Sequence, residues 1–160
     1  MHTAAQLLDL DTRAHACLAA LLDHCRGFSP DELNRELDGF GYPTVRLQLH
    51  HAIGAQEYWI GVLQGRVEPD FDDAAYPGID ELEAWRRRTA DLTAAYLRAT
   101  DEATLNAAVD LPTWGGRIRT LVPAQVVLRT VTHIFHHQGQ IAAMCRLLGR
   151  PVEGLDWPLT

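Results

Sequence analysis

Residues 123–149 read PAQVVLRTVTHIFHHQGQIAAMCRLLG, and this stretch decides the fold. Apolar residues recur in it every three or four positions, as on the buried face of a helix. Pro123 is typical of the first position of a helix, and Gly149 followed by Pro151 ends the pattern. At about 1.5 Å per residue, the stretch predicts one helix roughly 40 Å long.

Three further long helices are expected from apolar periodicity, capping residues and helix-stopping glycines. Their expected ranges are 3–27, 44–65 and 80 to about 100. Thr3 with Gln6, and Asp80 with Glu83, have the spacing of capping boxes, and Thr44 can cap the second helix. Each helix therefore has a predicted start as well as a predicted end.

The connections between these helices indicate their arrangement. Residues 66–78 form an acidic connection that is longer than a tight antiparallel turn requires, so we expect it to cross the bundle. Residues 105–121 hold Pro112 and Gly115-Gly116 between two short apolar segments, which predicts a short β-hairpin or an irregular lid. The fold class is therefore all-α, a four-helix bundle with a long crossover between helices two and three, in a single domain over residues 1–160.

Composition excludes several classes of protein. The formal net charge is -7 and the chain has no lysine, which argues against nucleic-acid binding. Its three cysteines, Cys17, Cys25 and Cys145, are an odd number without CxxC spacing, which favours reduced thiols. The N-terminus lacks the pattern of a signal peptide, and no apolar run approaches the roughly 20 residues that span a bilayer. We therefore expect a cytoplasmic protein that binds neither nucleic acid nor membrane.

Two groups of histidines carry the candidate chemistry. His133 and His137 are four residues apart in the last helix, so both imidazoles leave the same face and can bind one metal ion. His50 and His51 lie in the second helix, which a bundle can place opposite that face. The sequence therefore predicts a buried tri-histidine metal site.

Helical neighbours decide which histidines face inward. His51 shares its stripe with apolar residues and should point into the bundle, whereas His50 has more polar neighbours and should lie at the edge. His136 shares its stripe with polar residues and should face outward or toward a partner. The predicted metal ligands are therefore His51, His133 and His137.

Two motifs of this chain resemble those of one family. Residues 49–60 read LHHAIGAQEYWI, in which Trp59 follows His51 by eight positions, and residues 133–140 contain the pattern HxxxHxGQ. Both motifs resemble the DinB-like superfamily of metalloenzymes, also described as the DinB/YfiT type. The helix order and the long crossover fit as well, so the resemblance covers nearly the whole chain.

The resemblance carries expectations about chemistry and assembly. It implies that His51, His133 and His137 bind a divalent ion, often zinc or nickel, with water at the open positions. It also implies a homodimer, and kinship with transferases that use a low-molecular-weight thiol such as mycothiol or bacillithiol. The chain departs from the family pattern at Gln138, where arginine is usual, and at Gln56, where many members have glutamate.

Three neutral imidazoles leave coordination positions open, which is the pattern of a catalytic metal site. We interpret the chain as a divalent-metal-dependent enzyme acting on a small molecule, either a transferase that uses a low-molecular-weight thiol or a hydrolase. The metal would activate a thiol or water. Gln140 could orient a ligand from outside the coordination sphere of the metal. Two alternatives stay open: a non-catalytic homodimeric helical protein that binds metal for stability or stress sensing, and a metal-free scaffold in which the histidines only pack.

Overall fold

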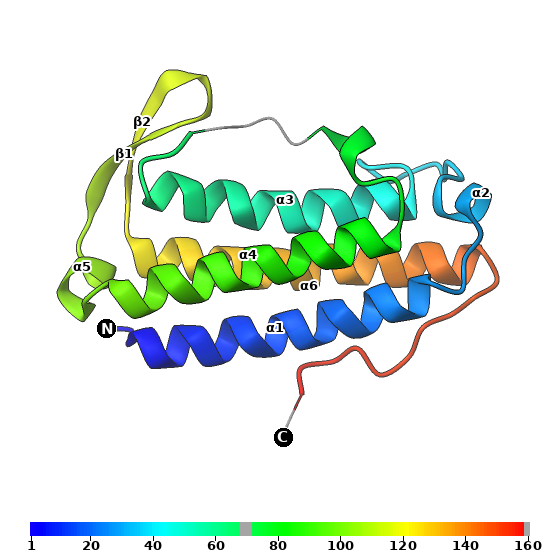
Figure 1. The fold of residues 1–160 in the computed structure, drawn as a ribbon, viewed down its shortest axis with the longest axis horizontal. Coiled ribbons are helices and arrows are strands. Elements are labelled where there is room, and N and C mark those ends of the chain that lie inside the picture. Colours follow the sequence, from blue (N-terminus) through cyan, green and yellow to red (C-terminus); the bar gives the residue numbers. More distant parts are fainter. Residues whose placement is uncertain (68–71, 159–160) are drawn as a thin grey trace.

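The structure is a computed structural model that describes residues 1–67 and 72–158. Four long helices pack side by side in it (Figure 1): α1 (Ala4–Cys25), α3 (Val45–Leu63), α4 (Ile79–Ala99) and α6 (Pro123–Leu147). The shorter elements are α2 (Pro30–Leu33), α5 (Glu102–Asn106), the 3-10 turns η1 (Asp73–Ala75) and η2 (Trp114–Gly116), and the strands β1 (Val109–Thr113) and β2 (Arg117–Leu121). The predicted helical bundle is confirmed.

The order of the helices in space requires a long crossover. Both α1 and α3 pack against α4 and α6, so α1 and α3 occupy opposite corners of the bundle. Figure 1 shows that α3 and α4 run in the same direction, opposite to α1 and α6. The connection from α3 to α4 therefore starts at one end of the bundle and finishes at the other, as predicted. Residues 68–71 of this connection lie outside the described part of the chain.

The core draws apolar side chains from all four long helices. Among the largest fully buried ones are Leu18 and Leu21 of α1, Ile53 of α3, Trp85 of α4 and Ile134 of α6. Burial of each such side chain stabilises the fold by about 1.5–3 kcal/mol, and together they fix the rotation of each helix about its axis. None of the described helices is both long and apolar enough to cross a membrane.

Most helix starts follow the local signals in the sequence. Thr3 and Gln6 form a reciprocal capping box at the start of α1. The hydroxyl of Thr44 accepts a hydrogen bond from a backbone N–H in the first turn of α3, and Pro123 is the first residue of α6. These three starts are as predicted, because caps depend on residues within one turn.

The capping box expected at Asp80 and Glu83 is wrong. α4 begins directly after Gly78, so Asp80 lies inside its first turn. Glu83 instead accepts hydrogen bonds from Arg86 at 2.6 and 2.8 Å and from Arg87 at 2.7 Å. Hydrogen bonds between two charged groups are stronger than one bond to a cap N–H, so the glutamate turns along the helix and not back toward its start.

Residues 105–121 contain the predicted hairpin. β1 and β2 pair antiparallel, and Gly115 and Gly116 make the turn with positive φ angles of 71° and 70°. At the tip, the backbone N–H of Trp114 donates a hydrogen bond of 2.7 Å to the hydroxyl of Tyr58 on α3. This bond holds the tip of the hairpin against α3.

Candidate metal centre

The three predicted ligands meet between α3 and α6. One ring nitrogen of each of His51, His133 and His137 lies within 4.8 Å of those of the other two. The ring centroids are 4.4 Å apart for His133 and His137, 4.7 Å for His51 and His137, and 5.1 Å for His51 and His133. The three histidines are therefore close enough to bind one metal ion.

The spacing and type of the donors fit a metal ion. The Nε2 atoms of His133 and His137 are 3.1 Å apart. Two imidazole nitrogens bound at about 2.0–2.1 Å to a tetrahedral ion would be about 3.3 Å apart. Neutral imidazole is a common ligand of zinc, nickel and other transition-metal ions, and three such ligands leave at least one position free.

Gln48 of α3 fixes the orientation of the His137 ring. Its Nε2 donates to the backbone carbonyl of Tyr42 at 3.0 Å and to Oε1 of Gln140 at 2.9 Å. A carbonyl oxygen can only accept, so the Gln48 Oε1 must face Nδ1 of His137, which lies 2.6 Å away. Nδ1 therefore carries the hydrogen, and Nε2 of His137 presents a lone pair toward the other two histidines.

Gln140 extends this hydrogen-bonded chain to the surface. Because its Oε1 accepts from Gln48, its Nε2 is the donor in the 2.7 Å contact with Nε2 of His136. His136 is exposed, as predicted from its polar neighbours. Gln140 thus acts on the site through Gln48, and the hydrogen bonds of its side chain go to Gln48 and His136 and not to the three central imidazoles.

Burial keeps the three imidazoles neutral. It lowers the pKa of His51 and of His133 from 6.5 to about 4, and that of His137 to about 3. The second cause is repulsion among neighbouring cationic groups, chiefly the other imidazoles. Tyr42 contributes to the burial by stacking on His51, with ring centroids 4.0 Å apart and an interplanar angle of 20°. The neutral ring is the form that binds a metal ion.

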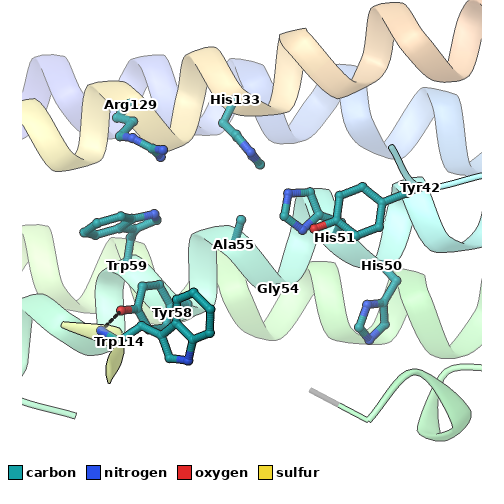
Figure 2. Close-up of a pocket in the computed structure, with 10 residues that line it drawn as sticks. All are labelled: Tyr42, His50, His51, Gly54, Ala55, Tyr58, Trp59, Trp114, Arg129 and His133. Atoms are coloured by element: carbon teal, nitrogen blue, oxygen red, sulfur yellow. Dashed lines mark hydrogen bonds between the residues drawn. The ribbon is translucent and has the colours of Figure 1, made fainter. Parts of the chain in front are cut away.

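His50 points away from the three central histidines (Figure 2). Its ring lies 4.9 Å from that of Trp85 on α4 and 5.5 Å from that of Tyr76 in the crossover. Its Nε2 is buried and has no hydrogen-bond partner among the described residues. His51 is the inward histidine, as predicted, whereas His50 lies against aromatic rings where the sequence suggested a polar edge.

The tri-histidine group opens onto a pocket of about 590 Å³. His51 and His133 line this pocket, and Figure 2 shows Tyr42 at one end and Trp114, from the hairpin, at the other. His137 is 5% exposed and is not among the residues that line the pocket. The volume lies within the range of about 300–1,000 Å³ that is usual for small-molecule sites.

Three residues of this centre were not identified from the sequence. Gln48 carried a signal, because an amide three residues before His51 in an apolar stretch lies on the same buried face. Arg129 carried one too, since it precedes His133 by four residues and lines the same pocket. Tyr42 carried none, because it lies in the loop before α3, where no periodicity predicts direction.

Comparisons with known proteins agree with this architecture. The sequence profile of the DinB superfamily matches residues 13–141. A solved structure described as a DinB-like protein from Bacillus cereus ATCC 10987 aligns with a TM-score of 0.74 and 17% identity, over 94% of this chain and 95% of that chain. No curated protein matches significantly. The profile covers most of the chain, including all three central histidines, and the chain therefore belongs to the DinB superfamily.

Proposed function

We propose that this protein is a divalent-metal-dependent enzyme that transfers a group to a low-molecular-weight thiol or hydrolyses a small substrate. The observation that supports this most is that His51 and His133 line an open pocket, where a substrate can approach the ligands. A structural metal site would be closed by four protein ligands. We rank thiol transfer ahead of hydrolysis because of the family resemblance alone.

The residues of the site have separable roles in this proposal. His51, His133 and His137 would hold the ion, with zinc and nickel as the candidates. Gln48 keeps the lone pair of His137 directed at the site, and Tyr42 shields one side of His51 from water. A bound divalent ion would supply Lewis-acid chemistry, lowering the pKa of water or of a thiol.

One observation favours a second candidate function. No aspartate or glutamate is among the described residues that line the pocket, so this part of the chain supplies no carboxylate general base there. A protein that binds metal for stability or sensing needs no such base. The thiol-transfer reaction also places little demand on one, because a metal ion can by itself stabilise the thiolate.

Metal content and turnover separate these functions. The protein should be purified without a histidine tag, and its metal measured by mass spectrometry. Metal-loaded and chelator-treated samples should then be incubated with mycothiol or bacillithiol and a small electrophile, and with panels of esters and amides. We expect metal-dependent turnover in wild type and in His136→Ala, whose side chain is exposed and does not line the pocket, and none in His51→Ala. If no reaction depends on the metal, the non-catalytic function becomes the better one.

A further inference from the structure

We propose that the pocket beside the three histidines binds a carboxylate group, with Arg129 as the residue that recognises it. That this carboxylate belongs to the substrate rests on the proposed function. The anion site itself rests on separate observations: the position of Arg129, the absence of an acidic partner for it among the described residues, and the charges around the pocket.

Arg129 is placed to act together with the metal ligands. It precedes His133 by four residues on α6, so the two side chains leave the same face of the helix about 5–6 Å apart. Figure 2 shows both extending from α6 toward α3, with Trp59 opposite Arg129 and His51 opposite His133. A ligand held by Arg129 would therefore have its next few atoms beside the histidines.

The guanidinium group is held in place but leaves its donors free. Its central carbon lies 5.0 Å from the ring centroid of Trp59, a cation–π contact. Within residues 1–67 and 72–158, no carboxylate lies within 4.0 Å of its nitrogens, and the side chain makes no hydrogen bond. By contrast, Arg46 and Arg86 form ion pairs with acidic side chains at 2.8 and 2.6 Å. A stacked arginine with free N–H groups is suited to bind a planar carboxylate with two parallel hydrogen bonds.

The surroundings of Arg129 are positive, although the whole chain has a net charge of -7. Arg117 and Arg119 of β2 line an adjoining cavity, which shares Trp59 and Trp114 with the pocket. No acidic residue is among the described residues that line either space. Three arginines with no acidic residue among the described lining residues create a positive potential that favours an anionic ligand.

The residues that line the pocket indicate the chemical nature of the rest of the ligand. Trp59, Tyr58 and Trp114 present aromatic rings, while Gly54 and Ala55 leave space between these rings and His51. Trp114 is 73% exposed at the mouth of the pocket, and an apolar ligand would cover part of it. We therefore assign to the pocket a small carboxylate with an aromatic or other planar body, whose far end reaches the histidines.

Binding of simple probes tests this assignment without any turnover. Benzoate, the uncharged benzamide and phenyl phosphate should be titrated into full-length protein, both chelator-treated and metal-loaded, by calorimetry and tryptophan fluorescence. We expect benzoate to bind the metal-free protein most tightly of the three. Arg129→Gln should weaken benzoate binding at least about tenfold, since hydrogen bonds between charged groups contribute roughly 1.5–3 kcal/mol, and should leave benzamide binding unchanged.

A matched variant controls for net charge. Arg88→Gln removes one positive charge from an exposed position on α4, away from the pocket, and should leave benzoate binding as in wild type. Arg129→Lys should recover only part of the affinity, because it keeps the charge and loses the planar pair of donors. Circular dichroism of each variant checks that the substitution, at an exposed position, leaves the helical fold intact.

Several results would overturn the proposal. Benzoate affinity that is equal in wild type and Arg129→Gln would do so, as would binding that requires the metal and ignores Arg129, because the carboxylate would then be a metal ligand. If phenyl phosphate bound more tightly than benzoate and its binding depended on Arg129, the group that the pocket recognises would be a phosphate and not a carboxylate. If benzoate bound neither to the metal-free nor to the metal-loaded protein, the pocket would not be a carboxylate site. The titration of metal-free protein requires neither metal nor turnover. It can therefore still test the carboxylate site if the proposed enzymatic function is wrong.

Discussion

Oε1 of Gln48 on α3 lies 2.6 Å from Nδ1 of His137 on α6. This bond joins the two helices that supply all three central histidines, and it selects the tautomer of His137 that can bind a metal ion. The ligand ring is therefore oriented before any ion arrives. Sites prepared in this way spend less free energy on ordering their ligands when the ion binds.

The first prediction concerns the ligands. His137→Ala should abolish metal binding, because two imidazoles hold a divalent ion far less well than three. Metal content per chain, measured by mass spectrometry after dialysis against a weak chelator, checks this. We expect about one ion per chain in wild type and close to none in the variant. Equal content in both would show that His137 is not a ligand.

Neighbouring histidines provide the controls for this substitution. His136→Ala removes an exposed ring next to His137 in sequence, and His50→Ala removes a ring that points away from the site. Both variants should retain nearly the full metal content. Loss of metal in His50→Ala together with retention in His51→Ala would mean that the register of α3 differs from the one described.

The second prediction concerns the orienting amide. Gln48→Leu keeps a similar side-chain volume but removes the acceptor for Nδ1 of His137, so metal affinity should fall by about 10–100-fold. Competition titration with a chelating dye measures the change. Gln125→Leu, on an exposed part of α6, is the matched control and should leave the affinity unchanged. An unchanged affinity in Gln48→Leu would exclude the orienting role.

The third prediction is the pH at which metal is released. A proton and a metal ion compete for the same nitrogen lone pair, so acid favours the free ion. A histidine with an ordinary pKa near about 6.5 would lose the ion in mildly acidic solution. Burial lowers the pKa values of His51 and His133 to about 4 and that of His137 to about 3, which moves release to lower pH.

We therefore expect full metal content from pH 7.5 to about 5, and release as the pH falls through about 4. Equilibrium dialysis at a series of pH values measures this, with circular dichroism to identify the pH at which the fold itself is lost. Release near pH 6 would mean that water reaches the rings. Retention by folded protein at pH 3 would point to ligands other than histidine.

The fourth prediction concerns a buried acid on α1. Asp11 is 2% exposed and accepts a hydrogen bond of 2.6 Å from Gln56. Burial raises its pKa from 3.8 to about 7, although this hydrogen bond acts in the opposite direction. Between pH 3.8 and about 7 the folded state holds a proton that the unfolded state has lost, so the contribution of Asp11 to stability falls as the pH rises through this range.

Asp11→Asn should therefore stabilise the protein more at pH 8 than at pH 5, by roughly 2 kcal/mol in the difference between the two. Thermal or urea unfolding of both proteins at the two pH values measures it. Asp9→Asn, at an exposed position two residues earlier, should show no such pH-dependent difference. The same change in stability at both pH values would show that Asp11 is ionised throughout.

The fifth prediction is assembly. We propose that the protein is a homodimer, as the family resemblance implies, formed through faces of its long helices. Light scattering coupled to size exclusion at micromolar concentration should give twice the mass of 17.8 kDa. A mass equal to one chain over the whole concentration range would contradict this prediction.

Much of the fold follows from local patterns in the sequence. Thr3, Thr44 and Pro123 begin helices because capping depends on neighbours within one turn. The spacing of Glu83 allows either a capping box with Asp80 or hydrogen bonds to the arginines three and four residues later. Spacing alone does not show which of these interactions has the lower free energy. Only the relative strength of the charged hydrogen bonds decides between them.

The candidate site was predictable only in part. Periodicity places His51 and His133 on inward faces, but it does not give the rotation of α3 against α6 that brings Gln48 to His137. The direction of the Arg129 side chain is even harder to predict from the sequence. Arg129 lies four residues before His133 and seven before His136, so at 3.6 residues per turn it falls between an inward and an outward stripe. Contacts across the bundle, such as the one with Trp59, settle its direction.

The three central histidines come from distant parts of the sequence, one from α3 and two from α6. An ion held by all three would close a loop that contains the whole of α4, α5 and the hairpin, as a cross-link between two helices would. Unfolding would then have to release the ion, so the free metal concentration would set thermal stability by mass action. In a cell short of this metal, the protein would therefore unfold more readily than the metal-loaded form.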